Sequence, residues 1–243
     1  MCQGQKKNPN LKGGFFMTKI TLVSVLGCDN NVEKTEKAFH HCANTFDFYD
    51  IKFLSSIEVP SLEKYRIKIP NLTYKEYNSF MGRMLGSFVS TDFCLTIQYD
   101  GFIIDANKWS DDFLNYDYIG APWANEPKNL VGNGGFSLRS QKFLREARKI
   151  PYCPDIMFPN MPPGTQRTPE DWFLCSYSYD EMSEAGIKFA PVPLAFDFSV
   201  EHPNKFKTWN RDDLSTYNSF GFHGPFNTAG MGVIHDEYNI TNK

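Results

Sequence analysis

The chain has 243 residues, a formal net charge of −3, 41% hydrophobic residues and 22% charged residues. This composition is typical of a globular protein and excludes a wholly disordered chain. A pI near 6.0 offers no basic surface to a polyanion, so we expect no nucleic-acid partner.

The N-terminal residues 1–17 are mostly polar and contain no apolar run long enough for a signal peptide or a membrane span. We expect them to form a flexible extension ahead of one domain over residues 18–243. None of the six cysteines forms a Cys-x-x-Cys pair, which argues against structural zinc. We therefore expect a cytoplasmic protein without a membrane span.

The first hundred residues alternate between predicted strands and helices. In chain order we predict strand Ile20–Leu26, helix Val32–Thr45, strand Tyr49–Leu54, strand Tyr65–Ile69, helix Thr73–Val89 and strand Asp92–Ile97. Such alternation favours a parallel α/β sheet. Ligands of these sheets bind beyond the carboxyl ends of the strands.

The second half has weaker periodicity. We predict strand Asp117–Ile119, a glycine turn and strand over Asn133–Leu138, helix Gln141–Lys149 capped by Ser140, a surface loop over Pro151–Pro169, helix Pro169–Ala185 ended by Gly186, and strand Lys188–Val192.

A carboxylate follows the predicted strand Asp92–Ile97. Asp100 could hold a divalent cation that binds a diphosphate. Gln98 points to the same side of an extended chain and could hydrogen-bond a ribose or a sugar hydroxyl. A turn aspartate that caps local backbone amides is an equally good interpretation of Asp100.

Two glycine-containing segments are further candidates. The run Gly132-Asn133-Gly134-Gly135 allows positive φ and a close approach of the backbone to a ligand, although Asn-Gly is also a strong hairpin signal. His223 lies between Gly221 and Gly224 and could bind a metal ion, or could be a structural histidine.

An acidic pair opens the predicted helix Pro169–Ala185. Thr168 as N-cap and Asp171 at the third position would form a capping box. Alternatively, Asp171 or Glu170 could be a general base in the cleft. Both roles are compatible if one carboxylate caps and the other is catalytic.

The order of the polar motifs resembles a family of glycosyltransferase-like proteins of bacteria and large viruses, mostly described as a domain of unknown function. The resemblance covers roughly residues 19–225. It rests on Gln98–Phe102, Trp109, Asp117–Trp123, Gly132–Arg139, Glu170–Asp171, Phe189–Pro191 and Phe220–Gly224.

That family in turn is similar to the GT-A class of nucleotide-sugar glycosyltransferases. The resemblance implies a mixed, mostly parallel central sheet flanked by helices. It also implies that Asp100 and His223 hold Mn²⁺ or Mg²⁺. Gln98 stands where the first aspartate of an Asp-x-Asp motif is expected, so the motif retains one carboxylate. The residues implied in donor binding are Val25, Ser55, Gln98, Asp100, Asn133, Gly134 and Gly135.

The resemblance implies a metal-dependent, hexosyltransferase-like enzyme. It would move a sugar from a nucleotide-diphosphate sugar, with uridine as the expected base, to an acceptor hydroxyl with inversion. Asp171, with Glu170 second, would be the catalytic base. Trp109, Trp123 or Trp172 could stack on an acceptor sugar, or could belong to the core.

Two other classes of function stay open. A non-catalytic sugar- or nucleotide-binding module of the same fold would explain the single carboxylate of the Asp100 motif. A metal-dependent phosphohydrolase is the other, although its chemistry needs several carboxylates around paired metals. The chain has no Gly-x-Ser-x-Gly, P-loop or Gly-x-Gly-x-x-Gly motif, so serine hydrolases, P-loop NTPases and dinucleotide enzymes lose support.

Overall fold

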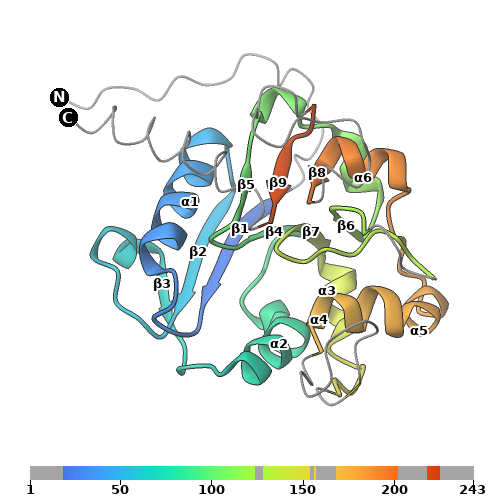
Figure 1. The fold of residues 1–243 in the computed structure, drawn as a ribbon, viewed down its shortest axis with the longest axis horizontal. Helices are drawn as coiled ribbons and strands as arrows, with labels where there is room; N and C mark the ends of the chain where they lie inside the picture. Colours follow the sequence, from blue (N-terminus) through green and yellow to red (C-terminus); the bar gives the residue numbers. More distant parts are fainter. Residues whose placement is uncertain (1–18, 124–127, 154–155, 157–167, 202–217, 225–243) are drawn as a thin grey trace.

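A computed structural model describes residues 19–123, 128–153, 156, 168–201 and 218–224. Its centre is a six-stranded sheet of order β3-β2-β1-β4-β7-β6, in which β7 is antiparallel to its neighbours and the other strands run parallel (Figure 1). The strands are β1 (Ile20–Leu26), β2 (Asp50–Ser55), β3 (Arg66–Lys68), β4 (Phe93–Ile97), β6 (Tyr118–Gly120) and β7 (Phe136–Ser140).

Helices cover both faces of this sheet. They are α1 (Val32–Thr45), α2 (Tyr74–Arg83), α3 (Gln141–Ala147), α4 (Glu170–Trp172), α5 (Tyr179–Glu184) and α6 (Val192–Phe198). Four 3₁₀ segments, at Pro60–Tyr65, Leu85–Ser87, Ala106–Lys108 and Asp111–Asn115, and one π-helical segment, Phe173–Tyr177, complete the described helical structure. Within the described chain no helix is both long and apolar enough to cross a bilayer.

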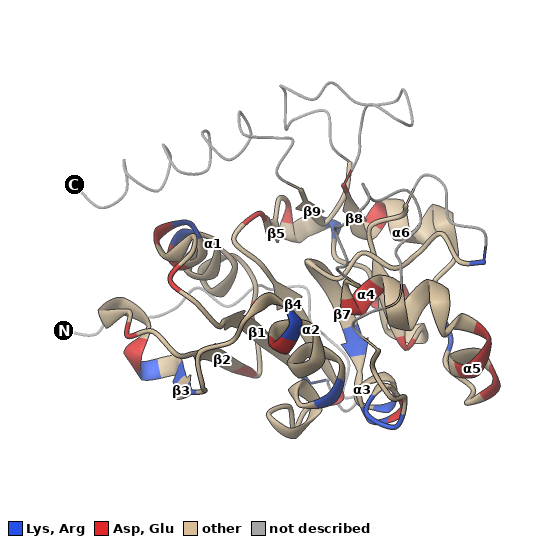
Figure 2. Cartoon of the chain, turned by 60° about the horizontal axis from the view of Figure 1, so that its bottom comes forward, with Lys and Arg blue, Asp and Glu red and all other residues tan. Residues whose placement is uncertain are grey.

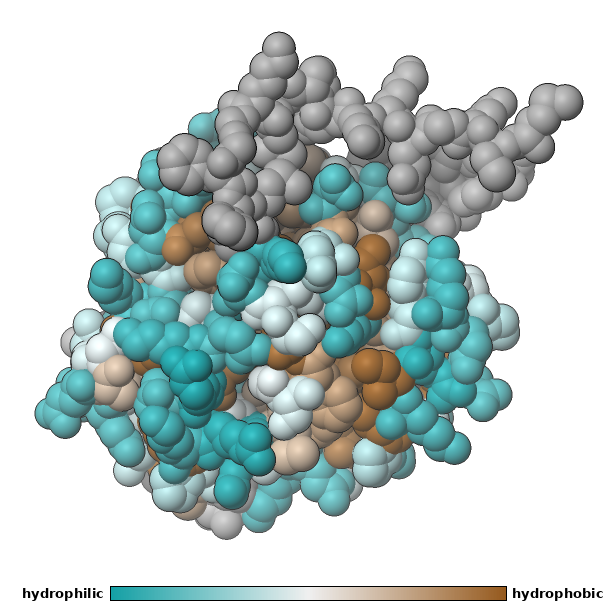
Figure 3. Space-filling model, turned by 180° about the vertical axis from the view of Figure 1, so that it is seen from behind, coloured by the Kyte–Doolittle hydropathy of each residue, from teal (hydrophilic) through white to brown (hydrophobic). Residues whose placement is uncertain are grey.

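The core has two parts because β1 is buried on both faces. Leu22 and Leu26 belong to the part that includes Phe39 of α1. Val23 and Val25 belong to the other part, which includes Phe80 of α2. This two-sided burial explains why β1 reads as a continuous apolar run rather than an alternating one. The surface shown in Figure 3 is mostly hydrophilic, with small separate hydrophobic areas.

A second, three-stranded sheet lies beside the first. Its order is β5-β9-β8, with β5 (Gly101–Ile103), β8 (Ser199–Val200) and β9 (Gly221–His223). β5 pairs antiparallel with β9, which pairs parallel with β8. The small sheet therefore brings the last described strand next to the segment that follows β4.

Four predictions of local structure are wrong. The predicted helix Thr73–Val89 ends as α2 at Arg83, and the 3₁₀ segment Leu85–Ser87 follows it. The predicted helix Pro169–Ala185 is interrupted: α4 is followed by a π-helical segment, Phe173–Tyr177, and then by α5. The predicted strand Lys188–Val192 forms one bridge, Tyr118 to Phe189, before α6 begins. Asn133-Gly134 is not a two-residue hairpin, because residues 121–135 separate β6 from β7.

Other predictions of local structure are confirmed. The Ser140 side chain caps α3 by accepting a hydrogen bond from the backbone of Phe143 at 3.0 Å. Gly186 follows α5 with φ of 80°, the left-handed conformation that favours glycine at a helix end. The predicted extension over residues 1–17 and most of the predicted loop Pro151–Pro169 lie outside the described residues.

Candidate functional site

The predicted site residues gather at the edge of the sheet where the parallel strands end. Ile97, the last residue of β4, pairs with Phe136, the first residue of β7. The segments that follow β4 and precede β7 therefore meet there. Gly101 pairs with His223, which brings the end of β9 to the same place.

Asp100 and His223 face each other inside this site. Asp100 Oδ1 and His223 Nε2 are 3.4 Å apart, and both side chains are about nine-tenths buried. Neither atom has a hydrogen-bond partner among the described residues. On the other side of the imidazole, Glu201 Oε1 lies 3.5 Å from His223 Nδ1. Burial favours the neutral ring, but the carboxylates of Asp100 and Glu201 outweigh it and raise the pKa of His223 to about 10.

The pair Asp100–His223 fits two ligand positions of a divalent cation. Two atoms that each lie roughly 2.1 Å from one cation can be up to about 4.2 Å apart, so a separation of 3.4 Å is compatible. The two unpartnered buried atoms are also the kind that a cation satisfies. The described residues contain no group of three His, Cys, Asp or Glu side chains suited to a metal ion. In the described part of the chain the pair therefore offers a cation one carboxylate oxygen and one imidazole nitrogen.

The turn Asn133–Gly135 lies between this pair and the acidic pair of α4. A Cβ on Gly135 would come within 1.9 Å of His223 Nε2, and a Cβ on Gly134 within 2.8 Å of Asp171 Cβ. The positive-φ glycines of the described chain are Gly186 and Gly224. The turn therefore does not use the positive φ that its glycines allow, and it is the close approach of Gly134 to Asp171 and of Gly135 to His223 that requires glycine.

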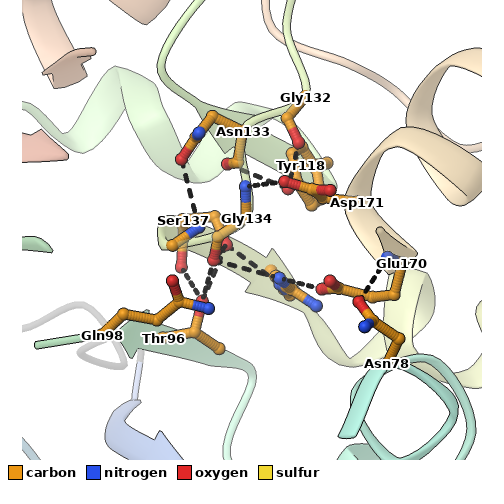
Figure 4. A network of polar contacts seen from close by, with 12 residues as sticks. Asn78, Thr96, Gln98, Tyr118, Gly132, Asn133, Gly134, Ser137, Glu170 and Asp171 are labelled. Carbon is orange, nitrogen blue, oxygen red and sulfur yellow. Dashed lines mark hydrogen bonds and ion pairs between the residues drawn. The ribbon is translucent and has the colours of Figure 1, made fainter. Parts of the chain in front are cut away.

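Asp171 and Glu170 point to different partners (Figure 4). Asp171 Oδ2 accepts a hydrogen bond from the backbone N–H of Gly134 at 2.8 Å, and Oδ1 accepts one from Trp172 at 2.7 Å. Burial and the adjacent charge of Glu170 raise the pKa of Asp171 to about 7, against the two hydrogen bonds that lower it. The carboxyl group therefore exchanges its proton near neutral pH.

Glu170 forms an ion pair in the interior. Its Oε1 lies 2.8 Å from Arg139 Nη2, and the two side chains are 6% and 1% exposed. In Figure 2 the acidic colour of α4 lies beside the basic colour of β7. The backbone N–H of Glu170 donates to Asn78 Oδ1 of α2 at 2.8 Å.

The predicted capping box at Thr168 is wrong. The N-cap position of α4 is Pro169, which makes no side-chain cap bond. The Thr168 hydroxyl donates instead to the carbonyl of Ile156 at 2.7 Å. Asn78 binds the first N–H of α4 from another helix, and Asp171 Oδ1 accepts the N–H of Trp172 in the same turn.

The remaining predicted donor-binding residues differ in how much polar side-chain surface they offer to a ligand. Asn133 Oδ1 accepts from Gly135 at 3.1 Å, which stabilises the turn. Gln98 Nε2 donates to the Tyr77 hydroxyl at 2.9 Å. Val25 is 9% exposed in the core, and Ser55 is fully buried.

The Ser55 hydroxyl already has a partner, because it accepts a hydrogen bond from the backbone N–H of Ile57 at 2.9 Å. Val25 and Ser55 thus lie at the carboxyl ends of β1 and β2 with little side-chain surface for a ligand. The three tryptophans of interest are packed: Trp109 contacts Phe220, Trp172 is 5% exposed, and Trp123 packs against Gly132.

The sequence alone predicts no role for Arg139, Asn78 or Glu201. Arg139 carried a signal, because it is a charged residue in the otherwise apolar and small run Phe136–Ser140. Asn78 and Glu201 carried none, since their partners are distant in the sequence.

Comparisons with known proteins agree with this architecture. A family model described as "Protein of unknown function (DUF5672)" matches residues 57–223. No curated protein matches the chain.

Solved structures with similar folds include glycosyltransferases. One is a glycosyltransferase involved in the glycosylation of the major capsid of PBCV-1, at 12% identity and a TM-score of 0.52, with 91% of this chain and 99% of that chain covered. Another is the glycosyltransferase GlyE of Streptococcus pneumoniae TIGR4, at 12% identity and a TM-score of 0.52, with 93% of this chain and 64% of that chain covered. The chain has the GT-A glycosyltransferase fold that the family resemblance implied.

Proposed function

The chain belongs to the DUF5672 family, and from its candidate site we propose that it is a metal-dependent glycosyltransferase. The reaction moves a sugar from a nucleotide-diphosphate sugar to an acceptor hydroxyl. One observation carries the proposal: the turn Asn133–Gly135 touches Asp171 through Gly134 and His223 through Gly135. A group that can remove a proton and a pair that can hold a cation therefore flank a single turn.

The donor side of the proposal uses Asp100 and His223. Held by these residues, Mn²⁺ or Mg²⁺ supplies positive charge to the diphosphate leaving group. At its raised pKa the free imidazole of His223 is protonated, so a cation bound there would have to displace the Nε2 proton, while Glu201 opposite Nδ1 keeps the remaining proton on that nitrogen. Gln98 and the backbone at the ends of β1 and β2 complete the donor side. Uridine as the base is supported by the resemblance to GT-A enzymes.

The acceptor side uses Asp171. A general base works best when its pKa lies near the operating pH, and the pKa of Asp171 is raised to about 7. The carboxylate takes the proton of the acceptor hydroxyl as the bond to the sugar forms. The transition state is oxocarbenium-like, and attack from the face opposite the leaving group gives inversion. Retention of anomeric configuration in the product, observed by NMR, would contradict Asp171 as the base.

A thermal-shift screen tests the donor side first. The ligands are UDP, GDP, ADP, CDP and their common sugar conjugates, each with MnCl₂ and with EDTA. A ligand at a hundred times its dissociation constant stabilises the fold by about 2.7 kcal/mol. We expect a manganese-dependent shift with one nucleotide family. A screen in which no nucleotide shifts the melting temperature would exclude the proposed function.

A non-catalytic binding module of the same fold is the second candidate. The observation that favours it is that both oxygens of Asp171 already accept backbone hydrogen bonds. This candidate predicts nucleotide-sugar binding with neither transfer nor donor hydrolysis. The phosphohydrolase alternative finds no support in the described part of the chain, where no cluster of three metal-binding side chains occurs.

A further inference from the structure

Arg139 lies in the interior of the candidate site, where it contacts both the turn Asn133–Gly135 and α4. Its side chain is 1% exposed and projects from β7. Nε donates to the Ser137 hydroxyl at 2.9 Å, and Nη2 donates both to the carbonyl of Gly134 at 3.2 Å and to Glu170 Oε1 at 2.8 Å. The guanidinium also lies 5.6 Å from the ring centroid of Tyr118.

These bonds form a closed ring of contacts. Arg139 binds Glu170, the chain continues directly to Asp171, Asp171 accepts from the N–H of Gly134, and the carbonyl of Gly134 accepts from Arg139. Figure 4 shows three labelled members of this ring, Gly134 on the turn and Glu170 and Asp171 on α4. Both backbone polar groups of Gly134 are therefore held: its N–H binds Asp171, and its carbonyl binds Arg139.

We infer that Arg139 is a positioning residue, and that Glu170 serves to bind it so that Asp171 and the Asn133–Gly135 turn keep one relative placement. The catalytic purpose of this placement rests on the proposed function. The placement itself can be tested without measuring turnover.

Stability alone does not explain a pair of this kind. A buried ion pair is often no more stabilising than well-packed apolar residues of similar volume, because both ions lose their water. The fork of the guanidinium, in contrast, lets one side chain donate to several acceptors in a fixed geometry. At Arg139 those acceptors belong to the strand, the turn and α4.

The test separates positioning from stability. The paired variant Arg139→Met/Glu170→Met removes both charges, whereas Arg139→Met alone leaves Glu170 buried without its partner. We expect the single variant to melt well below the parent and the paired variant to recover most of that loss. Arg139→Lys keeps the charge but cannot reproduce the three bonds, and it serves where a methionine variant does not fold.

Backbone hydrogen exchange provides the readout that needs no activity. We expect the Gly134 amide to exchange at least about tenfold faster in the paired variant and in Arg139→Lys, because its bond to Asp171 is no longer held. Amides of the β4–β7 ladder should keep parental rates. Parental protection of Gly134 in both variants would overturn the inference.

Turnover gives the second readout once a donor is known from the nucleotide screen. Misplacement of a catalytic group by about 1 Å costs about a hundredfold in rate, so we expect kcat of the paired variant to fall by that order while the donor KM changes little. Recovery of kcat together with the melting temperature would assign Arg139 a structural role only.

The control is the double variant Arg66→Met/Glu63→Met, which replaces an ion pair between β3 and the 3₁₀ segment before it. It should leave both the exchange rate of the Gly134 amide and kcat at their parental values. If the parent transfers no sugar, the proposed function fails and the exchange readout still decides the inference.

Discussion

Gly134 donates its backbone N–H to Oδ2 of Asp171 across 2.8 Å, and this bond joins the turn before β7 to the first residues of α4. The next residue of the turn, Gly135, packs so closely on His223 that no Cβ fits between them. Two adjacent glycines therefore set how far the candidate base lies from the candidate cation site. In the proposed reaction the donor sugar lies over this turn.

Replacing Asp171 tests its role as the base. Asp171→Asn keeps the size of the side chain and its acceptor oxygen for Gly134, but it cannot take a proton. We expect turnover to fall by roughly a hundredfold to ten-thousandfold, the usual contribution of such a group. The measurement is kcat for transfer from the donor identified by the nucleotide screen.

The matched control for this experiment is Asp180→Asn. Asp180 lies on α5 in an exposed ion pair with Lys128, away from the turn. Exposed pairs contribute little, so its turnover and stability should match the parent. Full turnover in Asp171→Asn would remove Asp171 from the mechanism.

The pH dependence of activity follows from the raised pKa of Asp171, about 7. The base must be ionised, so kcat/KM should rise with pH and level off above about 7, with this limb missing in the residual activity of Asp171→Asn. A profile that is flat from pH 5 to pH 8 would show that the ionisation of Asp171 does not control the reaction.

Stability should change with pH in the opposite direction. The pKa of Asp171 is about 7 in the folded chain, against 3.8 as the ordinary value, so between these values the folded state keeps a proton that the unfolded state releases. The contribution of Asp171 to stability is therefore present below about pH 4 and is lost as the pH rises through 7. The stability of the parent relative to Asp171→Asn should fall over this range, measured by denaturant unfolding at several pH values. An unchanged difference would contradict the raised pKa.

Local patterns in the sequence were sufficient to predict most of the central sheet. β1, β2 and β4 lie within one residue of their predicted ends, because long apolar, β-branched runs bounded by polar residues permit few other structures. The Ser140 cap was also predictable, since both partners lie within three residues.

The supports of the site could not be predicted in this way, because their partners are distant in the sequence. Asn78 caps the backbone of Glu170 from 92 residues away. Arg139 and Glu170 are separated by 31 residues. The local pattern at Thr168 suggested a capping box, but a tertiary contact from α2 replaced it. Roles of the individual site residues stay predictions until they are tested.

The cation site is tested by Asp100→Asn. This change removes the single carboxylate of the Gln98-Tyr99-Asp100 motif while keeping its volume, and a neutral amide is a much weaker ligand for Mn²⁺. We expect the manganese-dependent part of the nucleotide thermal shift to disappear. Asp112→Asn, at an aspartate of the Asp111–Asn115 segment, is the control and should keep the full shift. If Asp100→Asn keeps the manganese-dependent thermal shift of the parent, the cation does not bind at Asp100.

The close approach of the turn to His223 is tested by Gly135→Ala. The added Cβ would lie 1.9 Å from Nε2 and 2.2 Å from Cδ2 of the imidazole, so the ring must move out of its place beside Asp100. Overpacking of this kind costs about 1–3 kcal/mol of stability, and we expect the manganese-dependent nucleotide shift to be lost with it.

Gly82→Ala in α2 is the matched control, because its Cβ would lie 3.7 Å from Leu174, an ordinary contact. An alanine in a helix is favoured over glycine by roughly 0.5–1 kcal/mol, so the control should be at least as stable as the parent and keep its nucleotide response. If Gly135→Ala also keeps the stability and the nucleotide response of the parent, His223 does not depend on the turn for its position. The turn then cannot be what fixes the separation of the base and the cation.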